Sequence, residues 1–277
     1  MNLVNGSPAE LLPLTDRGLL YGDGLFETLA IRAGHALAWP QHMARLQQGC
    51  QRLGIPSPDT GLLQTEMQQL CRQADTAVLK IIITRGSGGR GYLPPADGHP
   101  SRILSLHPWP DYPARLAHDG IRARICGHRL PDNPDLAGIK HLNRLDQVLA
   151  RAEWDDPGIR EGLMLDARGH VIEGTMSNVF VIESGRLLTP SLEQAGVAGI
   201  LRAEILAWAR EQQFPHEVSS LPLVRLEGAE CVFVCNSLIG VWPVQGLQTP
   251  AGEWSWDASA NLPTKLTDHL RDRGILP

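Results

Sequence analysis

Two β-hairpins in the second half of the chain constrain its fold more than any other feature. Residues 162–174 (GLMLDARGHVIEG) turn at 167–169, and residues 178–188 (NVFVIESGRLL) turn at 184–185. Apolar runs on both sides of a short glycine-containing turn are typical of antiparallel strands. The other predicted strands and helices do not follow the strand–helix–strand alternation of a doubly wound parallel sheet. The sequence therefore predicts an α+β protein.

Chain length and one irregular stretch predict two domains. The 277 residues correspond to roughly two domains of about 150 residues each. Residues 108–120 contain three prolines and one glycine, which is typical of a linker. We therefore expect a small α+β domain over residues 1–112, a linker over 113–120 and a larger domain over 121–277.

Hydrophobic periodicity predicts the elements of each domain. Apolar residues recur at helical spacing after Pro40, and Gly54 ends this helix. The other elements expected in the first domain are strands over 2–12, 25–38, 78–84 and 103–106 and a helix over 59–74. Those expected in the second are strands over 121–130 and 231–235 and helices over 141–153, 199–213 and 262–273. The helix over 141–153 has one apolar face, formed by Leu142, Leu145, Val148, Leu149 and Ala152.

Composition argues against several classes of protein. The net charge is −5 and the arginines are scattered, so the electrostatic signature of a nucleic-acid-binding protein is absent and a small-molecule partner fits better. The five cysteines include no CxxC pair and indicate reduced core thiols in the cytoplasm. The N-terminus lacks the features of a signal peptide. The longest uncharged run, residues 231–252, is interrupted by polar residues, glycine and proline, so we expect no membrane helix.

A glycine-rich segment matches a dinucleotide-binding pattern but lacks its context. Residues 86–91 (GSGGRG) fit GxGxxG and follow a predicted strand. That site requires a helix to start at the glycines, whereas the letters YLPP that follow do not begin a packed helix. A nicotinamide-dependent oxidoreductase is therefore disfavoured. The segment is interpreted as a flexible surface loop, or as a loop over a substrate in which Arg85, Arg90 or Tyr92 contacts a carboxylate.

Lysine is rare in this chain, so chemistry that needs an amine has few candidates. Of the 25 lysine and arginine residues, only Lys80, Lys140 and Lys265 are lysines. Lys265 lies in an amphipathic helix that looks exposed, and Lys80 lies in a strand without a nearby acid. Lys140 ends the apolar loop AGIK, where its amine can be drawn into a cleft and form a Schiff base. A solvated lysine is the alternative.

Three sites offer what a phosphate-bearing pyridine cofactor needs. Residues 195–200 lead into a predicted helix, and Gly199 allows backbone N–H groups to approach an anion. Asn236 and Ser237 follow an apolar strand and add amides and a hydroxyl. Glu173 ends a strand, where its carboxylate can face a pyridine nitrogen. The alternatives are an ordinary turn, a polar strand end and a turn carboxylate bonded to backbone amides.

Five motifs, taken together, resemble the fold-type-IV pyridoxal phosphate enzymes, and they cover nearly the whole chain. They are YGDGLFET at 21–28, HMARL at 42–46, AGIKHLNRLDQVLAR at 137–151, EGTMSNVF at 173–180 and AGVAGILR at 195–202. The resemblance implies two domains, a small α/β N-terminal domain and a larger one with a barrel-like β core that carries the Schiff-base lysine. Within this group, RGSGGRGY at 85–92 and LAGIKHLNRLDQVL at 136–149 are most similar to the aminodeoxychorismate lyases.

The resemblance also implies roles for individual residues. It makes Lys140 the Schiff-base lysine, Glu173 the partner of the pyridine nitrogen, and Thr28 a neighbour of the substrate. The other cofactor contacts that it implies are Arg45, Ile200 and Ser237 at the phosphate and Asn178 near the cofactor. Gly199 and Asn236 are cofactor-binding candidates from the residues alone.

Substrate binding requires cations for two carboxylates. Arg90 is the first candidate, followed by Arg85, Tyr92 and Arg144. The reaction that the resemblance implies releases enolpyruvate from the substrate, and Lys140 or Thr28 is expected to protonate it.

The activity implied by the resemblance is the conversion of 4-amino-4-deoxychorismate to 4-aminobenzoate and pyruvate in folate biosynthesis. It implies pyridoxal 5'-phosphate as cofactor, no metal, and a homodimer. An aminotransferase of D- or branched-chain amino acids on the same fold is the alternative, and a catalytically silent binding protein is another. Arg144 stands where branched-chain aminotransferases have tyrosine and argues against that activity, whereas Glu27 is shared with aminotransferases. Leu201 replaces a threonine that some relatives use at the phosphate.

Overall fold

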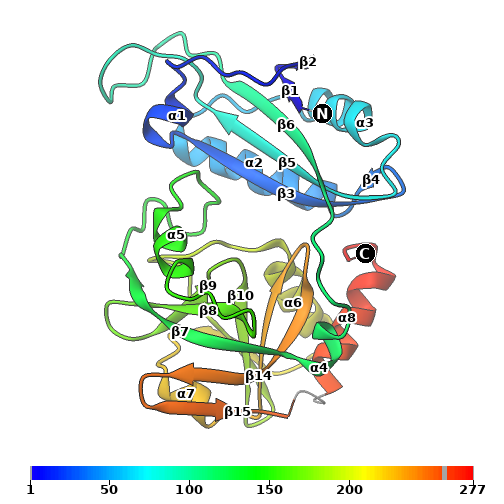
Figure 1. Cartoon of the computed structure of the whole chain (residues 1–277), viewed down its shortest axis with the longest axis vertical. Helices are drawn as coiled ribbons and strands as arrows, with labels where there is room; N and C mark the ends of the chain where they lie inside the picture. The colour runs from blue at the N-terminus through cyan, green and yellow to red at the C-terminus, as the bar shows by residue number, and fades with distance from the viewer. Residues whose placement is uncertain (1, 258–260, 277) are drawn as a thin grey trace. The chain divides into compact units, whose positions relative to one another are not determined.

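The structure, a computed structural model, describes residues 2–257 and 261–276. Its internal contacts divide these residues into two compact units (Figure 1). Unit 1 contains the residues up to Pro110, the segment 139–143 and Leu276, and unit 2 contains all other described residues. Each unit combines a β-sheet with helices, so the predicted α+β class is confirmed.

Unit 1 is built on one antiparallel sheet with the strand order β2-β1-β6-β5-β3-β4. Its strands are β1 (Asn2–Val4), β2 (Ser7–Pro8), β3 (Gly24–Arg32), β4 (His35–Ala36), β5 (Thr76–Thr84) and β6 (Ser101–Pro108). Its helices are α1 (Arg17–Tyr21), α2 (Trp39–Leu53) and α3 (Thr60–Cys71).

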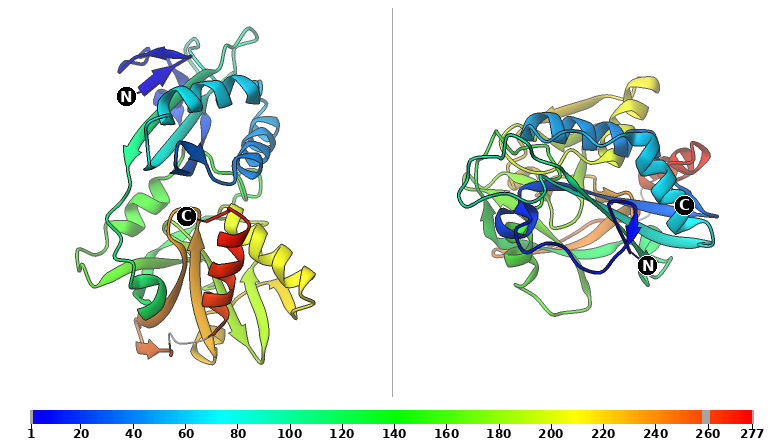
Figure 2. Two further views of the ribbon diagram at one scale, coloured as in Figure 1. Left: turned by 90° about the vertical axis from the view of Figure 1, so that its right-hand side faces the viewer. Right: turned by 90° about the horizontal axis from the view of Figure 1, so that it is seen from above.

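Helix α2 forms where the helical spacing of apolar residues predicts it. Met43, Leu46 and Cys50 are buried, and the helix contacts β3. It ends at Gly54, whose φ of 61° lies in the left-handed region that glycine adopts without strain. Helix α3 begins at Asp59, whose carboxylate accepts a 2.8 Å hydrogen bond from the N–H of Leu62. Figure 2 shows both helices on the same face of the sheet.

The predicted strand over residues 2–12 is wrong beyond its start. Only β1 and the two-residue β2 form, and the chain then leads into α1, which was not predicted. Asp16 causes this change of direction. Its fully buried carboxylate accepts hydrogen bonds from the N–H of Gly18 and from the hydroxyls of Thr84 and Ser101, at 2.8–2.9 Å. These contacts cap α1 and join it to β5 and β6.

Unit 2 contains a nine-stranded sheet whose main path is β12-β11-β10-β13-β14-β7-β8-β9, with β15 paired to β14. Its strands are β7 (Ile121–Leu130), β8 (Ile159–Asp166), β9 (Val171–Gly174), β10 (Asn178–Glu183), β11 (Arg186–Pro190), β12 (His216–Ser219), β13 (Cys231–Asn236), β14 (Gly240–Thr249) and β15 (Gly252–Ser255). Its helices are α4 (Leu116–Asp119), α5 (Leu145–Arg151), α6 (Ile200–Glu211), α7 (Val224–Glu227) and α8 (Asn261–Asp272).

Both predicted hairpins form within this sheet. Strands β8 and β9 pair antiparallel, as do β10 and β11, which meet at Ser184 and Gly185 in the left-handed region. Parallel pairs join β7 to β8 and to β14, so the sheet is mixed. Although β9 is the last strand of the path, it also contacts β10 and β11. The sheet is therefore curled, as the barrel-like β core requires.

The predicted helix over residues 141–153 starts too early. Its first residues instead pair with β3, because the N–H of Phe26 donates to Lys140 O at 3.0 Å and that of Leu142 donates to Gly24 O at 2.9 Å. Helix α5 therefore begins only at Leu145. Its apolar face does not pack into a core, since the side chains of Leu145, Val148 and Leu149 are 56–74% exposed.

The division into units differs from the predicted residue ranges in several places. Segment 139–143, with Lys140, belongs to unit 1, whereas the sequence assigned that lysine to the larger domain. The reason is its pairing with β3. Residues 113–120 form no bare linker, because α4 lies within them and packs on β14.

The cysteines agree with the sequence prediction. All five are buried and free of disulfide bonds. Within the described part of the chain, no helix combines the length and the apolar character that crossing a membrane requires.

We predict that Gly24→Ala destabilises the protein by about 1–3 kcal/mol, the usual cost of forcing extra atoms into a packed site. A Cβ at this position would lie 2.4 Å from the carbonyl oxygen of Ile83 and 2.8 Å from a methyl carbon of Leu142. Gly89→Ala is the control because its Cβ would meet nothing within 4 Å, and we expect a change within about 0.5 kcal/mol. Urea unfolding measures both. Equal effects of the two variants would contradict the packing argument.

Candidate active site

Lys140 lies beside the first half of β3. Its Nζ is 4.3 Å from the ring centroid of Phe26, and the residue is half-buried. Phe26 and Thr28 are two residues apart on β3, so their side chains share one face of the sheet. Lys80, on β5, pairs with Thr28, and its Nζ lies 5.4 Å from the same ring. Unit 1 therefore gathers Lys140, Thr28 and Lys80 around Phe26, whereas Lys265 is exposed, as expected.

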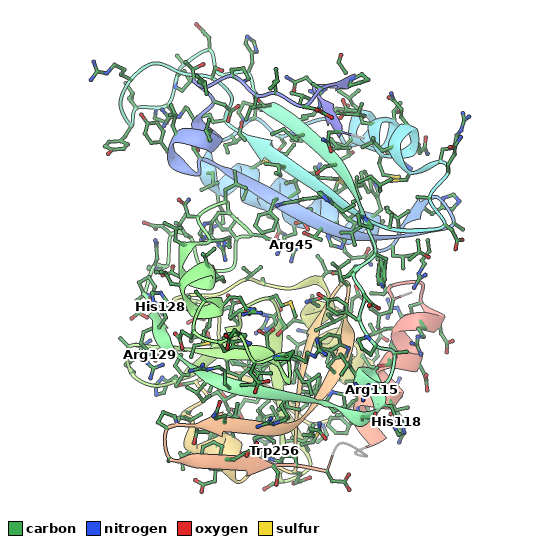
Figure 3. The ribbon with its side chains drawn as sticks, in the orientation of Figure 1. Arg45, Arg115, His118, His128, Arg129 and Trp256 are labelled. Atoms are coloured by element: carbon green, nitrogen blue, oxygen red, sulfur yellow. The ribbon has the colours of Figure 1, made fainter. Side chains whose placement is uncertain are left out.

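Glu27 connects two side chains of α2 to β3. This carboxylate is 1% exposed, accepts a 2.8 Å hydrogen bond from Arg45 Nε and a second from Arg45 Nη2, and lies 2.6 Å from His42 Nδ1. Burial opposes its ionisation, but the charge of Arg45 and the donated hydrogen bonds outweigh burial and lower the pKa of Glu27 to about 2. Glu27 is therefore ionised and fixes Arg45, which Figure 3 shows on α2.

His42 completes this buried group. Burial lowers the pKa of His42 below the ordinary value and outweighs Glu27, whose hydrogen bond and charge raise it. The charges of Arg45 and Lys140 lower this pKa further. The neutral ring then donates Nδ1–H to Glu27. Its Nε2 atom is buried without a hydrogen-bond partner among the described residues.

Glu173 occupies the end of β9 in unit 2. It is 4% exposed, and its Oε2 accepts a 2.8 Å hydrogen bond from the N–H of Val197. Its Oε1 accepts from Gln147 Nε2 at 3.3 Å. The bond from the N–H of Val197 is a backbone contact of the kind expected if Glu173 is only a turn carboxylate, which was the alternative interpretation. The sequence did not identify Gln147, although its position seven residues after Lys140 in the same motif was a possible signal.

Asn178 fixes the start of α6. Its Nδ2 donates to Val197 O at 2.8 Å, and its Oδ1 accepts from the N–H of Gly199 at 3.1 Å. A Cβ at Gly199 would lie 2.0 Å from that Oδ1, so any larger residue here would displace the Asn178 side chain from these bonds. Helix α6 begins after Gly199 without a side-chain cap, and its first N–H groups, from Ile200 onward, are the donors that an anion would use.

Asn236 and Ser237 form the turn that follows β13. Asn236 Oδ1 accepts from the N–H groups of Leu238 and Ile239, and its Nδ2 donates to Met176 O at 2.9 Å. These contacts of Asn236 are those of a turn-forming side chain. Ser237 is half-buried in this turn, next to the β10–β13 ladder that contains Asn178.

Arg144 immediately precedes α5 in unit 2. Burial lowers its pKa below the ordinary value, while the charges of Glu173 and Asp146 act in the opposite direction. A guanidinium remains charged even so, and this one lies within electrostatic reach of Glu173.

The residues proposed for the glycine-rich loop have different environments. Arg85 is 8% exposed and donates from Nε to Asp23 at 2.7 Å and from both Nη atoms to the carbonyls of Leu53 and Gly54. It therefore holds the end of α2. Arg90 and Tyr92 are exposed.

The backbone of the same loop is held by a residue that sequence reasoning missed. Arg17 donates to the carbonyls of Gly91 and Tyr92 at 3.0 Å and forms an ion pair with Asp23. Residues 85–100 are all described, and none of them is helical. A dinucleotide site needs a helix that starts at the glycines, so its rejection agrees with the structure.

The residues present fit pyridoxal phosphate chemically. Its aldehyde needs an amine, its ring nitrogen an acid, and its phosphate N–H and hydroxyl donors. Lys140 offers the amine, Glu173 is a buried carboxylate, and the uncapped start of α6 exposes backbone donors. Because residue 199 is glycine, no side chain covers the backbone there.

The chain is similar to known proteins over most of its length. Residues 24–247 match the model of the amino-transferase class IV family. An aminodeoxychorismate lyase of Vibrio harveyi is 36% identical over 247 residues, which cover 89% of this chain and 91% of the relative. A putative branched-chain-amino-acid aminotransferase of Methanocaldococcus jannaschii is 32% identical over 233 residues, covering 83% and 80%.

A solved structure extends the likeness to the three-dimensional level. The crystal structure of 4-amino-4-deoxychorismate lyase from Pseudomonas aeruginosa matches with a TM-score of 0.93 and 48% identity, covering 98% of each chain. The fold-type-IV architecture predicted from the five motifs is therefore confirmed.

We predict that Glu27→Gln removes a pH-dependent part of the stability. A carboxylate whose pKa falls from 4.5 to about 2 on folding contributes about 3 kcal/mol above pH 5, and this contribution is lost as the pH falls from 4.5 towards 2. The difference in unfolding free energy between the wild type and the variant should therefore be large at pH 7 and shrink by pH 3. Urea unfolding at pH 7, 5 and 3 measures it. A difference that stays constant with pH would contradict the ionised state of Glu27.

Proposed function

Since the chain belongs to the class-IV aminotransferase family, we propose that it is a pyridoxal-phosphate-dependent lyase that converts 4-amino-4-deoxychorismate to 4-aminobenzoate and pyruvate. One observation carries this proposal: a lyase of that name matches this chain over almost its whole length at 48% identity. The departure at Arg144 supports it, because branched-chain aminotransferases have tyrosine there.

The proposed cofactor contacts are the residues that the family resemblance implies. Lys140 supplies the amine that binds the aldehyde, and Glu173 holds the proton on the pyridine nitrogen. Arg45, the N–H groups at the start of α6 and Ser237 bind the phosphate. When bound, the cofactor withdraws electrons from the substrate carbon next to the amine.

The proposed proton transfers use unit 1. The Lys140 amine removes the proton from the amine-bearing ring carbon of the substrate, and Lys140 or Thr28 protonates the departing enolpyruvate carbon. Both residues lie next to Phe26 in unit 1, which supports a shared role. Loss of enolpyruvate makes the ring aromatic, so the reaction runs strongly towards products.

The substrate carboxylates need cationic partners. The hydrogen bonds that a candidate residue already makes within the protein decide whether we propose it as such a partner. Arg85 is committed to Asp23 and to two carbonyls of α2, so we assign it to structure. Arg90 and Tyr92 in the glycine-rich loop and Arg144 before α5 are the proposed substrate contacts.

An aminotransferase is the second candidate function, because a relative of that name is 32% identical over most of the chain. Turnover without a keto-acid acceptor separates the two. A lyase releases pyruvate and 4-aminobenzoate in equal amounts, whereas an aminotransferase consumes an acceptor in each cycle.

We predict equimolar release of the two products by the purified protein loaded with pyridoxal phosphate, without an acceptor. Lys140→Ala should lower kcat/KM at least about 10³-fold, because one positioned proton carrier alone contributes about 10²–10⁴-fold. Lys265→Ala, at an exposed position, is the control and should leave the rate unchanged. Borohydride reduction and peptide mapping should place the cofactor on Lys140. An adduct on Lys80 or Lys265 would refute the assignment.

We also propose a cytoplasmic homodimer. The five buried free cysteines suit a reducing compartment. The apolar side chains of α5, Leu145, Val148 and Leu149, are exposed in the single chain, and such a patch is typical of an interaction site.

We predict that Leu145→Asp combined with Val148→Asp converts the dimer to a monomer, because each charge would be buried in the interface. Sedimentation velocity measures the change. Val224→Asp is the control, since Val224 is a 68% exposed apolar residue on α7 of the same unit, and it should leave the dimer intact. A wild-type monomer with full activity would refute the dimer, and an unchanged dimer in the double variant would refute this interface.

A further inference from the structure

Glu161 is a buried acid that the proposed chemistry does not use. It lies on β8 and is 0% exposed. Within the described residues, no lysine, arginine or histidine forms an ion pair with it. A carboxylate without a counter-ion in a protein interior is costly unless other groups compensate for its lost hydration.

Neutral donors provide that compensation. Glu161 Oε1 accepts from the N–H of Gly162 at 2.8 Å, from the N–H of Thr175 at 3.0 Å and from Thr175 Oγ1 at 2.6 Å. Its Oε2 accepts from Ser177 Oγ at 2.6 Å and from the N–H of Met176 at 3.4 Å. Four of these five donors belong to the loop 175–177, so the loop is folded around one carboxylate.

The loop 175–177 joins three parts of the candidate site. Glu173 precedes it at the end of β9, and Asn178 follows it at the start of β10. Between them, Met176 O accepts the hydrogen bond from Asn236, in the turn that contains Ser237. The position of this loop therefore affects the acid, the start of α6 and the turn after β13.

The loop wraps closely around the carboxylate. The N–H of Gly174 donates to Ser177 O at 2.7 Å, which closes the turn. A Cβ at Gly174 would lie 2.4 Å from Ser177 Oγ and 2.6 Å from Glu161 Oε2. There is consequently no room for the loop to shift while these contacts are kept.

The geometry points to Glu161 as a positioning residue, whose carboxylate holds the loop 175–177 so that Glu173 and Asn178 are placed to bind the pyridine cofactor. This inference rests on the proposed function, because it assumes that these two residues contact the cofactor.

Both oxygens of Glu161 face backbone N–H groups, those of Gly162 and Thr175 at Oε1 and that of Met176 at Oε2, so both oxygens must act as acceptors. An ionised carboxylate accepts at both oxygens, whereas a glutamine of the same shape turns an NH₂ group towards one set of donors. The backbone N–H groups of the loop cannot reorient. Burial raises the pKa of Glu161 above its ordinary value, while the donors from Ser177, Thr175, Gly162 and Met176 oppose this shift.

The test uses Glu161→Gln in the full chain, with Glu66→Gln as the matched control. Glu66 is 3% exposed and pairs with Arg102 at 2.8 Å in unit 1, so its substitution also removes a buried carboxylate. Three quantities are measured for each protein: the dissociation constant of pyridoxal phosphate, the pH dependence of the visible absorption of the loaded protein, and the unfolding midpoint without cofactor.

We expect Glu161→Gln to raise the dissociation constant of pyridoxal phosphate at least about 10-fold, the usual effect of removing a residue that orients a ligand. The absorption should also titrate at a different pH, because Glu173 is displaced from the pyridine nitrogen. Glu66→Gln should lower the unfolding midpoint but change the dissociation constant less than about 2-fold. An unchanged dissociation constant and titration in Glu161→Gln, with a lowered midpoint, would show a structural role only and overturn the inference.

Ser177→Ala keeps the test decisive if Glu161→Gln does not fold. It removes one of the five donors and should raise the dissociation constant in the same direction by a smaller factor; no change in that constant would overturn the inference. The wild type separates this inference from the proposed function. If the wild type does not bind pyridoxal phosphate, the proposed function fails. If it binds and turns over while the variants bind equally well, only the role of Glu161 fails.

Discussion

The main-chain pairing of residues 139–143 with β3 is the contact on which the position of the candidate lysine depends. Lys140 lies in neither a helix nor a named strand, and it is held by the bonds that join its segment to Gly24 and Phe26. Gly24 permits this approach because it has no side chain. The same strand carries Thr28 on the face of Phe26 and, by alternation, Glu27 on the other face, where α2 packs. A single strand thus brings the amine, a hydroxyl and the anchor of Arg45 into one unit.

Two buried carboxylates are stabilised in opposite ways. Glu27 is compensated by a cation, and its pKa falls to about 2. Glu161 is compensated by neutral N–H and O–H donors, and burial raises its pKa. The first arrangement fixes a charged side chain of unit 1, and the second fixes a stretch of backbone in unit 2. The two carboxylates differ in what they fix because their donors differ. A guanidinium belongs to one side chain, which the carboxylate orients, whereas backbone amides belong to a loop, whose shape the carboxylate holds.

The sequence predicted most of what has a local or repetitive signal. The hairpins, α2, α6 and the family followed from periodicity, turn residues and motifs. The helix over 141–153 was predicted too long because the pairing of 139–143 with β3 joins residues more than a hundred positions apart. Asp16 and Arg17 were missed for the same reason, since each is defined by distant partners. Glu161 was missed because its partners lie mainly in an irregular loop 14–16 residues further along the chain, which has no periodicity. The residues themselves made Lys140 and Glu173 candidates, and the resemblance implied their roles and that of Arg45. All three roles stay proposals, as periodicity does not report on chemistry.

The glycine-rich loop is held through its carbonyl groups. Arg17 bonds to the backbone oxygens at 91 and 92 and not to the side chains there. Every amino acid offers the same carbonyl, so a change of side chain at 90 or 92 leaves these two bonds in place, and a change at 92 removes only the edge-to-face contact of Tyr92 with Tyr21. If Arg90 and Tyr92 contact the substrate as proposed, exchanging them would change the substrate preference while Arg17 still holds the backbone of the loop.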